Sequence, residues 1–391
     1  MNIKPFVVAA IVGITSVTAY AQKAELNKAK SSFEKYEGLK SMSPKISKPI
    51  LNEAKASIDK AALDSKTGAM AETWAYRALI YSSIAAADTT GKTSAAPTQE
   101  ATAALKKAVE LDTKGEQKAN IAKVNTTLAQ LALNQGVREY KAQKYADAYT
   151  AFNSGLTYMP NDTTFTYYAG LSAMAAKDYP KAIDKLSGLL KTNYSNLEDV
   201  YNNLSLLYAA QKDTAKAIEV SAEGAKRFPK NTALAQREIE LSLMTGKQDE
   251  VISRIEEQAA KEPKNKLYPY YLGIAYSNAK NKDLAKAEEN YKKAIEIDPS
   301  YTDAYINLGG LIMNNGIDRY NKANKIKDQK VYEAEMKKAN ADFDRAFPYV
   351  QKAAELDPKN KLALSNLKTY YLIKKNQAKV AEIQKQLDSL Q

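Results

Sequence analysis

The chain has 391 residues, 45% of them hydrophobic, and its 57 Lys and Arg against 45 Asp and Glu give a formal net charge of +12. It contains no cysteine and no histidine, which excludes disulfides, thiolate nucleophiles, zinc-finger sites and catalysis by a histidine base or a serine–histidine triad. Carboxylates, Lys and Tyr remain as catalytic candidates. Since no converging set of them is evident, we expect no enzymatic activity, no cofactor and no metal.

The N-terminus has the three parts of a secretory signal peptide. Lys4 supplies the positive charge, and the apolar stretch from Phe6 to Val17 is too short to span a bilayer. Ala19 and Ala21 are small residues at the two positions that a signal peptidase inspects. We therefore expect residues 1–21 to be a signal peptide and the mature chain to be exported, with the periplasm favoured over the extracellular medium. The alternative is a buried or anchoring N-terminal helix. No later segment is apolar enough to cross a membrane.

Residues 22–64 are predicted to form a helix pair that caps the rest of the chain. The apolar residues of its first helix do not keep the spacing found later in the sequence, which is why we expect a cap and not a repeat. The apolar residues of the two helices are Leu26, Phe33 and Leu39, then Ile50, Ala54, Ile58 and Ala61.

The next predicted pair begins near Trp74 and has a polar loop from Asp88 to Gln99 between its helices. Within this loop, Gly91-Lys92-Thr93 looks like the end of a phosphate-binding loop. The first glycine of such a loop is replaced by Ala86, and the preceding segment is helical and not a strand. Nucleotide binding is therefore not expected.

In the middle of the chain a motif returns about every 34 residues. It consists of a small residue, a larger residue one helical turn later, a second small residue, and a proline that ends the helix. The small residues let two helices approach closely, and the large ones fill the space between them. The motif is seen in Ala148-Phe152-Gly155-Pro160 and Ala287-Tyr291-Ala294-Pro299, and with a weaker second member in Ala217-Ser221-Gly224-Pro229.

This pattern resembles the tetratricopeptide repeat, a helix–turn–helix unit of about 34 residues. Trp74, Ala78 and Tyr81 also fit the first helix of that unit. The resemblance implies an all-α fold, a right-handed α-α superhelical solenoid of about nine tetratricopeptide-type helical hairpins, with the array extending over residues 65–391. It also implies a non-enzymatic scaffold that binds a protein or peptide partner.

Near the C-terminus, the interval from Pro299 to Pro358 is longer than one repeat, and the excess lies between Asn314 and Arg345. Apolar residues keep helical spacing on both sides of this segment, which predicts a long projecting helical hairpin at about 314–345. A mobile insertion is the alternative. The length of the hairpin suggests a second binding site as a hypothesis. Residues 360–391 are expected to form a polar terminal cap.

The family register places a candidate binding groove on the first helices of the hairpins. Its residues combine tyrosine, which gives contact area at a small entropy cost, with amides that can pair with a peptide backbone. The alternative is that many of them only pack against neighbouring helices. The candidate groove residues are Tyr140, Tyr167, Leu171, Asn202, Leu206, Gln236, Tyr270, Ile274 and Ile306. Because the positions equivalent to the family's carboxylate clamp contain no lysine, that mode of binding is not expected.

The charges are spread along the chain, because Lys and Glu interleave on most predicted helices. This pattern favours a solvated surface, and export would make nucleic acid an improbable partner. Removal of Lys4 with the signal peptide leaves a net charge of +11. A second hypothesis stays open, in which the chain is a basic structural or assembly factor of the cell envelope that associates with anionic lipid or cell-wall polymer.

Four short motifs have two possible meanings. They resemble an O-glycosylation acceptor motif of some exported bacterial proteins, but Asp followed by Thr is also an ordinary helix N-cap, which we favour. The motifs begin with the pairs Asp88-Thr89, Asp162-Thr163, Asp213-Thr214 and Asp388-Ser389.

Overall fold

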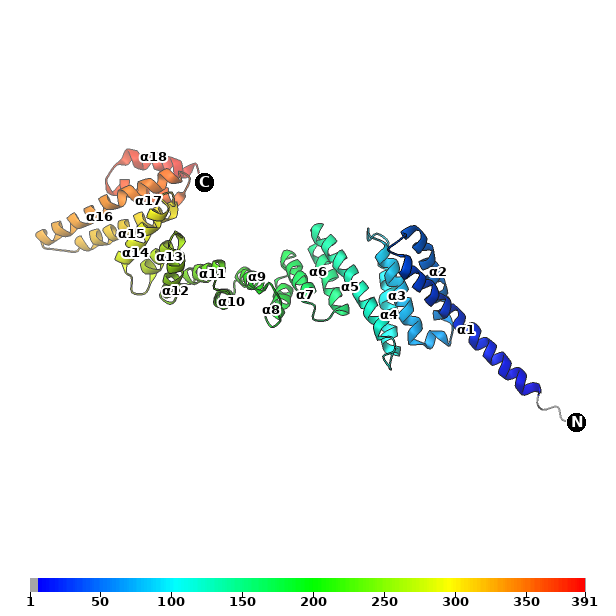
Figure 1. The fold of residues 1–391 in the computed structure, drawn as a ribbon. Helices are drawn as coiled ribbons and strands as arrows, with labels where there is room; N and C mark the ends of the chain where they lie inside the picture. The colour runs from blue at the N-terminus through cyan, green and yellow to red at the C-terminus, as the bar shows by residue number, and fades with distance from the viewer. Residues whose placement is uncertain (1–5, 391) are drawn as a thin grey trace. The chain divides into compact units, whose positions relative to one another are not determined.

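A computed structural model describes residues 6–390, and the side chains of residues 23–390 except Pro44. This part of the chain forms eighteen α-helices and one short 3-10 helix, with no strand (Figure 1). The predicted all-α fold is therefore confirmed. The predicted signal peptide, residues 1–21, lies outside the residues whose side chains are described.

The helices belong to two compact units, residues 1–200 and 201–391, a division that the sequence did not predict. The first unit contains α1 (Phe6–Leu39), α2 (Pro44–Leu63), η1 (Thr67–Ala69), α3 (Ala71–Ala87), α4 (Ala95–Leu111), α5 (Lys118–Lys141), α6 (Tyr145–Tyr158), α7 (Thr163–Ala175) and α8 (Tyr179–Leu189). The boundary falls within α9 (Leu197–Ala210). The second unit continues with α10 (Thr214–Arg227), α11 (Thr232–Met244), α12 (Gln248–Lys261), α13 (Leu267–Asn278), α14 (Leu284–Ile297), α15 (Thr302–Ala323), α16 (Gln329–Leu356), α17 (Lys361–Ile373) and α18 (Gln377–Asp388).

Side-chain caps begin several of these helices. Asp162 accepts a hydrogen bond from the backbone N–H of Phe165 at 2.9 Å, and Asp213 accepts one from Lys216 at 3.1 Å. The predicted capping role is confirmed for these two residues. The other two motifs differ: Asp88 lies at the end of α3 and binds the loop that follows, and Asp388 is the last residue of α18.

The turns within hairpins are closed by single residues in the left-handed conformation, with φ near +60°. Such a residue ends the first helix and frees its last carbonyls to accept hydrogen bonds from the turn. The non-glycine residues in this conformation after α5, α7, α9 and α17 are Gln143, Lys177, Lys212 and Lys375.

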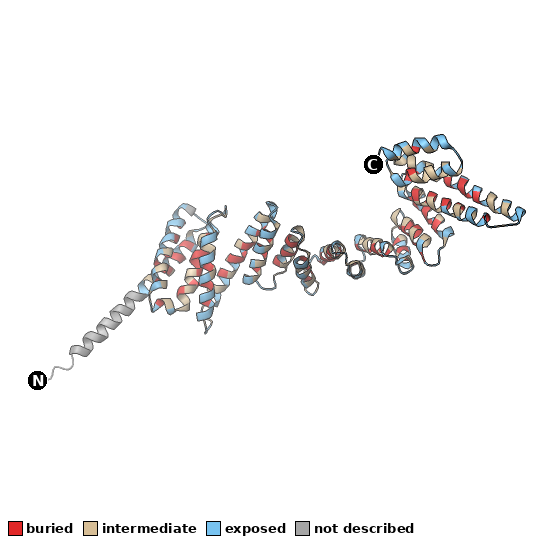
Figure 2. Cartoon of the chain, turned by 180° about the vertical axis from the view of Figure 1, so that it is seen from behind, coloured by how far each residue is buried: buried red, intermediate tan, exposed pale blue. Residues whose placement is uncertain are grey.

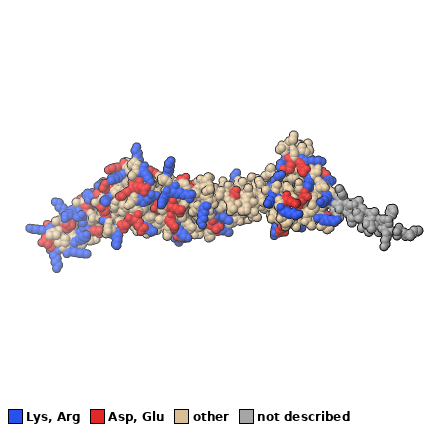
Figure 3. Space-filling model, turned by 60° about the horizontal axis from the view of Figure 1, so that its bottom comes forward, with Lys and Arg blue, Asp and Glu red and all other residues tan. Residues whose placement is uncertain are grey.

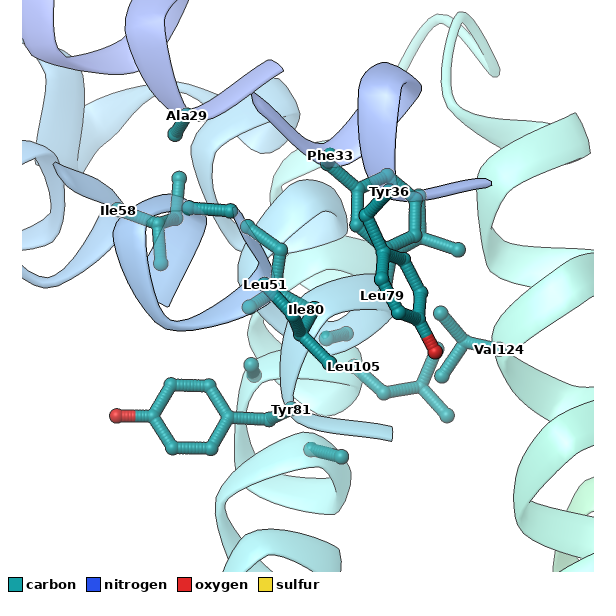
Figure 4. Close-up of a cluster of buried hydrophobic side chains, with 14 of the residues drawn as sticks. Ala29, Phe33, Tyr36, Leu51, Ile58, Leu79, Ile80, Tyr81, Leu105 and Val124 are labelled. Carbon is teal, nitrogen blue, oxygen red and sulfur yellow. The ribbon is translucent and has the colours of Figure 1, made fainter. Parts of the chain in front are cut away.

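The core at the start of the first unit joins five helices. Figure 4 shows side chains of α1, α2, α3, α4 and α5 converging in it, among them Phe33, Ile58, Ile80, Leu105 and Val124. The helix pair α1–α2 thus shares its apolar core with the following hairpin, because its apolar faces have no other cover.

Trp74, the only tryptophan of the chain, lies at the edge of this core. Its indole N–H donates a hydrogen bond to the carbonyl of Gly68 at 2.8 Å, and the ammonium of Lys107 lies 3.8 Å from the ring centroid. The loop after α3 is shorter than predicted, since α4 begins at Ala95 and takes Pro97 into its first turn, where proline needs no hydrogen-bond donor.

The repeat motif forms the contacts between successive helices. Ala148 and Phe152 are fully buried on α6, and a Cβ atom added to Gly155 would overlap the ring of Phe165 on α7. Glycine is therefore required there by close packing. Within each unit, Figure 2 shows the buried residues on helix faces turned toward neighbouring helices.

In the second unit, α15 and α16 contain 22 and 28 residues and lie side by side as the long hairpin, drawn in yellow and orange in Figure 1. Residues 314–345 lie within this hairpin. Its inner contacts include Phe343, which is 2% exposed, and the buried carboxylate of Asp342. Both arms of the hairpin are therefore helices, and apolar residues pack between them.

The chain continues with α17 and α18. Phe347 of α16 stacks on Tyr370 of α17, with ring centroids 4.4 Å apart. Of the described residues of α18, Ile383 is buried, and the rest of the helix is largely exposed. On the face drawn in Figure 3, Lys and Arg side chains are interspersed with Asp and Glu. No helix in the described part of the chain combines the length and apolar character needed to cross a membrane.

Candidate protein-interaction surfaces

The predicted groove residues fall on both units. Tyr140, Tyr167 and Leu171 belong to the first unit, and the other candidates belong to the second.

Two cavities of the first unit lie along α5. The larger, of about 860 Å³, is lined by the loop after α3, the first turns of α4, and a row on α5 that includes Gln130, Asn134 and Arg138. The smaller, of about 590 Å³, is lined by Leu133, Val137, Tyr168 and again Arg138. This side of α5 thus has a polar cavity and a more apolar cavity, and the guanidinium of Arg138 lines both.

The predicted tyrosines of the first unit lie near this surface in aromatic contacts. Tyr140 is 38% exposed at the end of α5 and packs edge-on against Tyr145, with ring centroids 5.2 Å apart. Tyr167 is half-buried on α7, where its ring lies 5.7 Å from that of Tyr168 and 5.1 Å from that of Tyr194. Leu171 is half-buried one turn further along α7. None of these three lines the two cavities, whereas Tyr168, which was not among the candidates, does.

In the second unit four tyrosines gather around Tyr270 of α13. Its ring centroid lies 6.0 Å from that of Tyr271, 6.0 Å from that of Tyr291 on α14, and 5.0 Å from that of Tyr301 in the turn before α15. We call these four residues the tyrosine cluster. Tyr271 and Tyr291 are buried, and Tyr270 and Tyr301 are half-buried, so the latter two give the cluster its accessible part.

Polar side chains from neighbouring helices fix the positions of these phenols. The hydroxyl of Tyr271 donates to Glu240 of α11 at 2.5 Å, and Gln236 donates to the same carboxylate at 2.9 Å. The amide of Asn307 on α15 donates to the hydroxyl of Tyr270 at 3.0 Å. The first helices α11, α13 and α15 are thereby linked through hydrogen bonds of the cluster.

Burial keeps the phenols of the cluster neutral. It raises the pKa of Tyr270 to about 12, with a further contribution from the negative charge of Asp303. Burial also raises the pKa of Tyr291 to about 12, and it raises the pKa values of Tyr271 and Tyr301 above the usual tyrosine value. At neutral pH all four hydroxyls are therefore hydrogen-bond donors.

Next to the cluster, Lys266 forms an ion pair with Asp298, and its ammonium lies 4.5 Å from the ring centroid of Tyr301. The hydrogen bond from Lys266, followed by those from Ser300, lowers the pKa of Asp298 to about 2. A cation–π contact with Lys266 thus helps to hold Tyr301 in place.

The remaining candidates differ in exposure. Gln236, Asn202 and Ile274 are half-buried, and Leu206 is 38% exposed on α9. Ile306 is 4% exposed and packs with Ala353 and Ala363, so the structure places it in the core and not on the predicted groove surface. The reason is that α16 and α17 cover this part of α15.

Tyr301 and Asn307 are not among the groove residues that the sequence predicts. Tyr301 lies in a turn, outside the helical register from which the candidates were extrapolated. Its position two residues after the repeat proline Pro299 was the available signal. Asn307 directly follows the candidate Ile306, and the register favoured the wrong one of the two.

The chemistry of these surfaces is that of binding. Within the described residues, no group of three or more Asp and Glu is placed to hold a metal ion. Aromatic rings, amides and a shared guanidinium provide apolar contact and hydrogen bonds.

Comparison with known proteins agrees with the repeat pattern. The family model described as a tetratricopeptide repeat matches residues 133–198, and one described as a TPR repeat matches residues 277–316. Each unit therefore contains a segment that matches a tetratricopeptide-repeat model. No curated protein matches it.

Solved structures of three repeat proteins are similar to the chain. A TPR repeats protein from Bacteroides fragilis is 26% identical, with 63% of this chain and 98% of that chain covered and a TM-score of 0.32. The C-terminal part of a TPR repeat-containing protein from Cytophaga hutchinsonii is 17% identical, with 65% and 93% covered and a TM-score of 0.49. YrrB, described as a TPR protein with an unusual peptide-binding site, is 19% identical, with 51% and 95% covered and a TM-score of 0.38.

Proposed function

We propose that this chain of tetratricopeptide repeats is a non-enzymatic scaffold that binds a peptide or protein segment on its first-helix surfaces. The observation that supports it most directly is the tyrosine cluster, in which Tyr270 and Tyr301 present half-buried rings beside amide groups. Tetratricopeptide repeats of this kind commonly act through such extended surfaces.

The physical argument rests on preorganisation. The rings of the cluster are already in contact, and hydrogen bonds position the hydroxyls of Tyr270 and Tyr271, so a partner would not have to order these groups on binding. Tyrosine rings provide apolar contact, and phenol and amide groups can exchange hydrogen bonds with a peptide backbone.

We further propose that the scaffold is exported, to the periplasm in preference to the extracellular medium. The support is the sequence pattern of residues 1–21. Expression of the intact chain with an epitope tag, followed by cell fractionation and N-terminal sequencing, tests this directly. A mature N-terminus at Gln22 in the periplasmic fraction is the expected result, and an uncleaved chain in the cytoplasm would contradict it.

The binding proposal is tested by selecting peptides from a displayed library on the immobilised mature chain. Synthetic copies of the selected peptides are then titrated by fluorescence anisotropy. Replacing both Tyr270 and Tyr301 with Ala should weaken peptides that bind the second unit by about tenfold or more, because aromatic contacts at an interface often carry that much binding energy.

Tyr320→Ala is the matched control, since Tyr320 is 43% exposed on α15 and makes none of the cluster's ring contacts. Circular dichroism should show equal helix content in all variants. Selection that yields no peptide, or peptides whose affinity is the same for every variant, would contradict the proposal.

The second candidate, a basic envelope factor, is favoured only by the net charge of +12. The alternation of charges in Figure 3 and the many ion pairs within helices, such as Lys293–Glu289 at 2.7 Å, reduce the field that a polymer would meet. Adhesion to anionic vesicles that falls steeply with added salt would support this candidate, whereas salt-insensitive peptide binding supports the scaffold.

A further inference from the structure

Arg138 occupies an unusual position on α5 of the first unit. It lines both cavities, and its guanidinium lies against Gly91 in the loop between α3 and α4. Gly91 has φ of +72°, and a Cβ atom at this position would overlap the guanidinium. The left-handed glycine thus gives the loop the shape that accommodates Arg138.

The acidic groups around the larger cavity are already engaged. Asp88 accepts hydrogen bonds from the backbone and hydroxyl of Thr90 and of Thr93, which hold its pKa well below the usual range. Glu139 pairs with Lys144 at 3.7 Å. The carboxylates that line the cavity therefore have partners of their own.

The cations that line the same cavity do not. Over residues 23–390, neither Arg138 nor Lys92 makes an ion pair or a side-chain hydrogen bond. Asp88 keeps its negative charge, because its partners are neutral N–H and O–H groups. Two cations, Arg138 and Lys92, therefore stand against one carboxylate without a cationic partner, and the small positive excess is complementary to an anionic group.

The wall of the cavity adds amide groups at helical spacing. Gln130 donates to the side-chain carbonyl of Asn134 at 3.0 Å, which leaves the carbonyl of Gln130 and the NH₂ of Asn134 available as one acceptor and one donor. A peptide unit offers the complementary donor and acceptor. Arg138 lies one helical turn after Asn134 on α5. It also lines the smaller cavity, together with Leu133, Val137 and Tyr168.

We infer that this site binds an acidic peptide segment of a partner protein, with Arg138 holding an Asp or Glu side chain and the cavity of Leu133 and Val137 taking an apolar side chain next to it. The inference rests on the proposed scaffold function and specifies its ligand in the first unit. Arginine presents a planar pair of donors to a carboxylate, so the contact is directional as well as charged.

The test compares peptide selection on the mature wild-type chain with selection on Arg138→Gln. Wild type should enrich peptides with one acidic residue at a fixed position beside an apolar one. The variant should lose this preference, and synthetic copies of the enriched peptides should bind it about tenfold or more weakly. Lys141→Gln is the matched control, because Lys141 is an exposed cation at the end of the same helix and lines neither cavity.

A second variant, Gly91→Ala, perturbs the site without changing its charge. It should displace the guanidinium and weaken the same peptides, while Arg138→Lys should retain only part of the affinity because it loses the paired donors. Equal helix content by circular dichroism shows that each variant is folded.

The outcomes separate this inference from the proposed function. If wild type selects peptides that depend on Tyr270 and Tyr301 but have no acidic preference, the inference is wrong and the scaffold function stands. If no peptide is selected, both are wrong. If oligogalacturonate binds wild type in an Arg138-dependent manner and acidic peptides do not, the site takes an acidic glycan and the inference is overturned.

Discussion

The carboxylate of Asp342 on α16 faces the guanidinium of Arg319 on α15, with 2.9 Å between Oδ2 and Nε. Asp342 is 6% exposed and accepts hydrogen bonds from Arg345 at 2.9 Å and Asn315 at 3.2 Å, whereas its contact with Nε of Arg319 is an ion pair without a hydrogen bond. One buried acid thereby holds three polar groups of the long hairpin.

Asp342→Ala should lower the free energy of unfolding by about 2 kcal/mol, because it removes a buried carboxylate that pairs with Arg319 and accepts hydrogen bonds from Arg345 and Asn315. Urea titration followed by circular dichroism measures the change. Asp344→Ala is the control, since Asp344 is a 63% exposed acid on the same helix and should change stability by less than about 1 kcal/mol. Equal effects of the two substitutions would refute the role assigned to Asp342.

Two glycines of the first unit should respond to alanine with opposite signs. Gly155→Ala should destabilise the chain by about 1–3 kcal/mol, because its new methyl group would overlap Phe165. At Gly188 of α8 an added Cβ meets no atom within 4 Å, so Gly188→Ala should be neutral or stabilising by up to about 1 kcal/mol. Thermal unfolding of both variants checks the signs, and destabilisation by Gly188→Ala would contradict the expectation.

Substitutions of Asp162 test its role as a helix N-cap apart from its possible role in a glycosylation motif. Asp162→Ala should cost about 1 kcal/mol because the N–H of Phe165 loses its acceptor, whereas Asp162→Asn should retain most of the stability since asparagine also caps helices well. Chain purified from a heterologous host without the glycosylation machinery isolates the capping effect in urea titration. Similar losses for both variants would show that the side-chain cap is not responsible.

The tyrosine cluster predicts a loss of stability at alkaline pH. The pKa of Tyr270 rises from 10.0 to about 12 on folding, so the folded chain retains the phenolic proton where the unfolded chain releases it. The stabilisation is therefore fully present below pH 10 and is lost as the pH rises toward about 12. Urea midpoints measured across this range should fall less steeply for Tyr270→Phe than for wild type. Parallel slopes would mean that Tyr270 does not contribute.

The repeat register predicts local packing well, because the packing at these positions depends only on the neighbouring helices. Ala148, Phe152 and Gly155 are buried as the small–large–small spacing requires. Ile306 was assigned wrongly because its environment depends on α16 and α17, which cover α15 only once the long hairpin has formed. A register taken from shorter hairpins carries no information about that cover.

The site around Arg138 could not have been predicted for a different reason. Its position depends on the loop from Asp88 to Ser94, whose path follows from a left-handed Gly91 and from the hydrogen bonds of Asp88. Sequence reasoning expected a longer loop and considered Gly91 only as part of a nucleotide motif. Of the tyrosine cluster, the sequence predicts Tyr270 as a groove residue, because this position lies on a first helix.

The indole of Trp74, beside Gly68 and Lys107, has a practical consequence. Trp74 is the single tryptophan of the chain, and it belongs to the first unit. Selectively excited indole emission therefore comes from the first unit alone, and it reports on the surroundings of Trp74 with no dye attached.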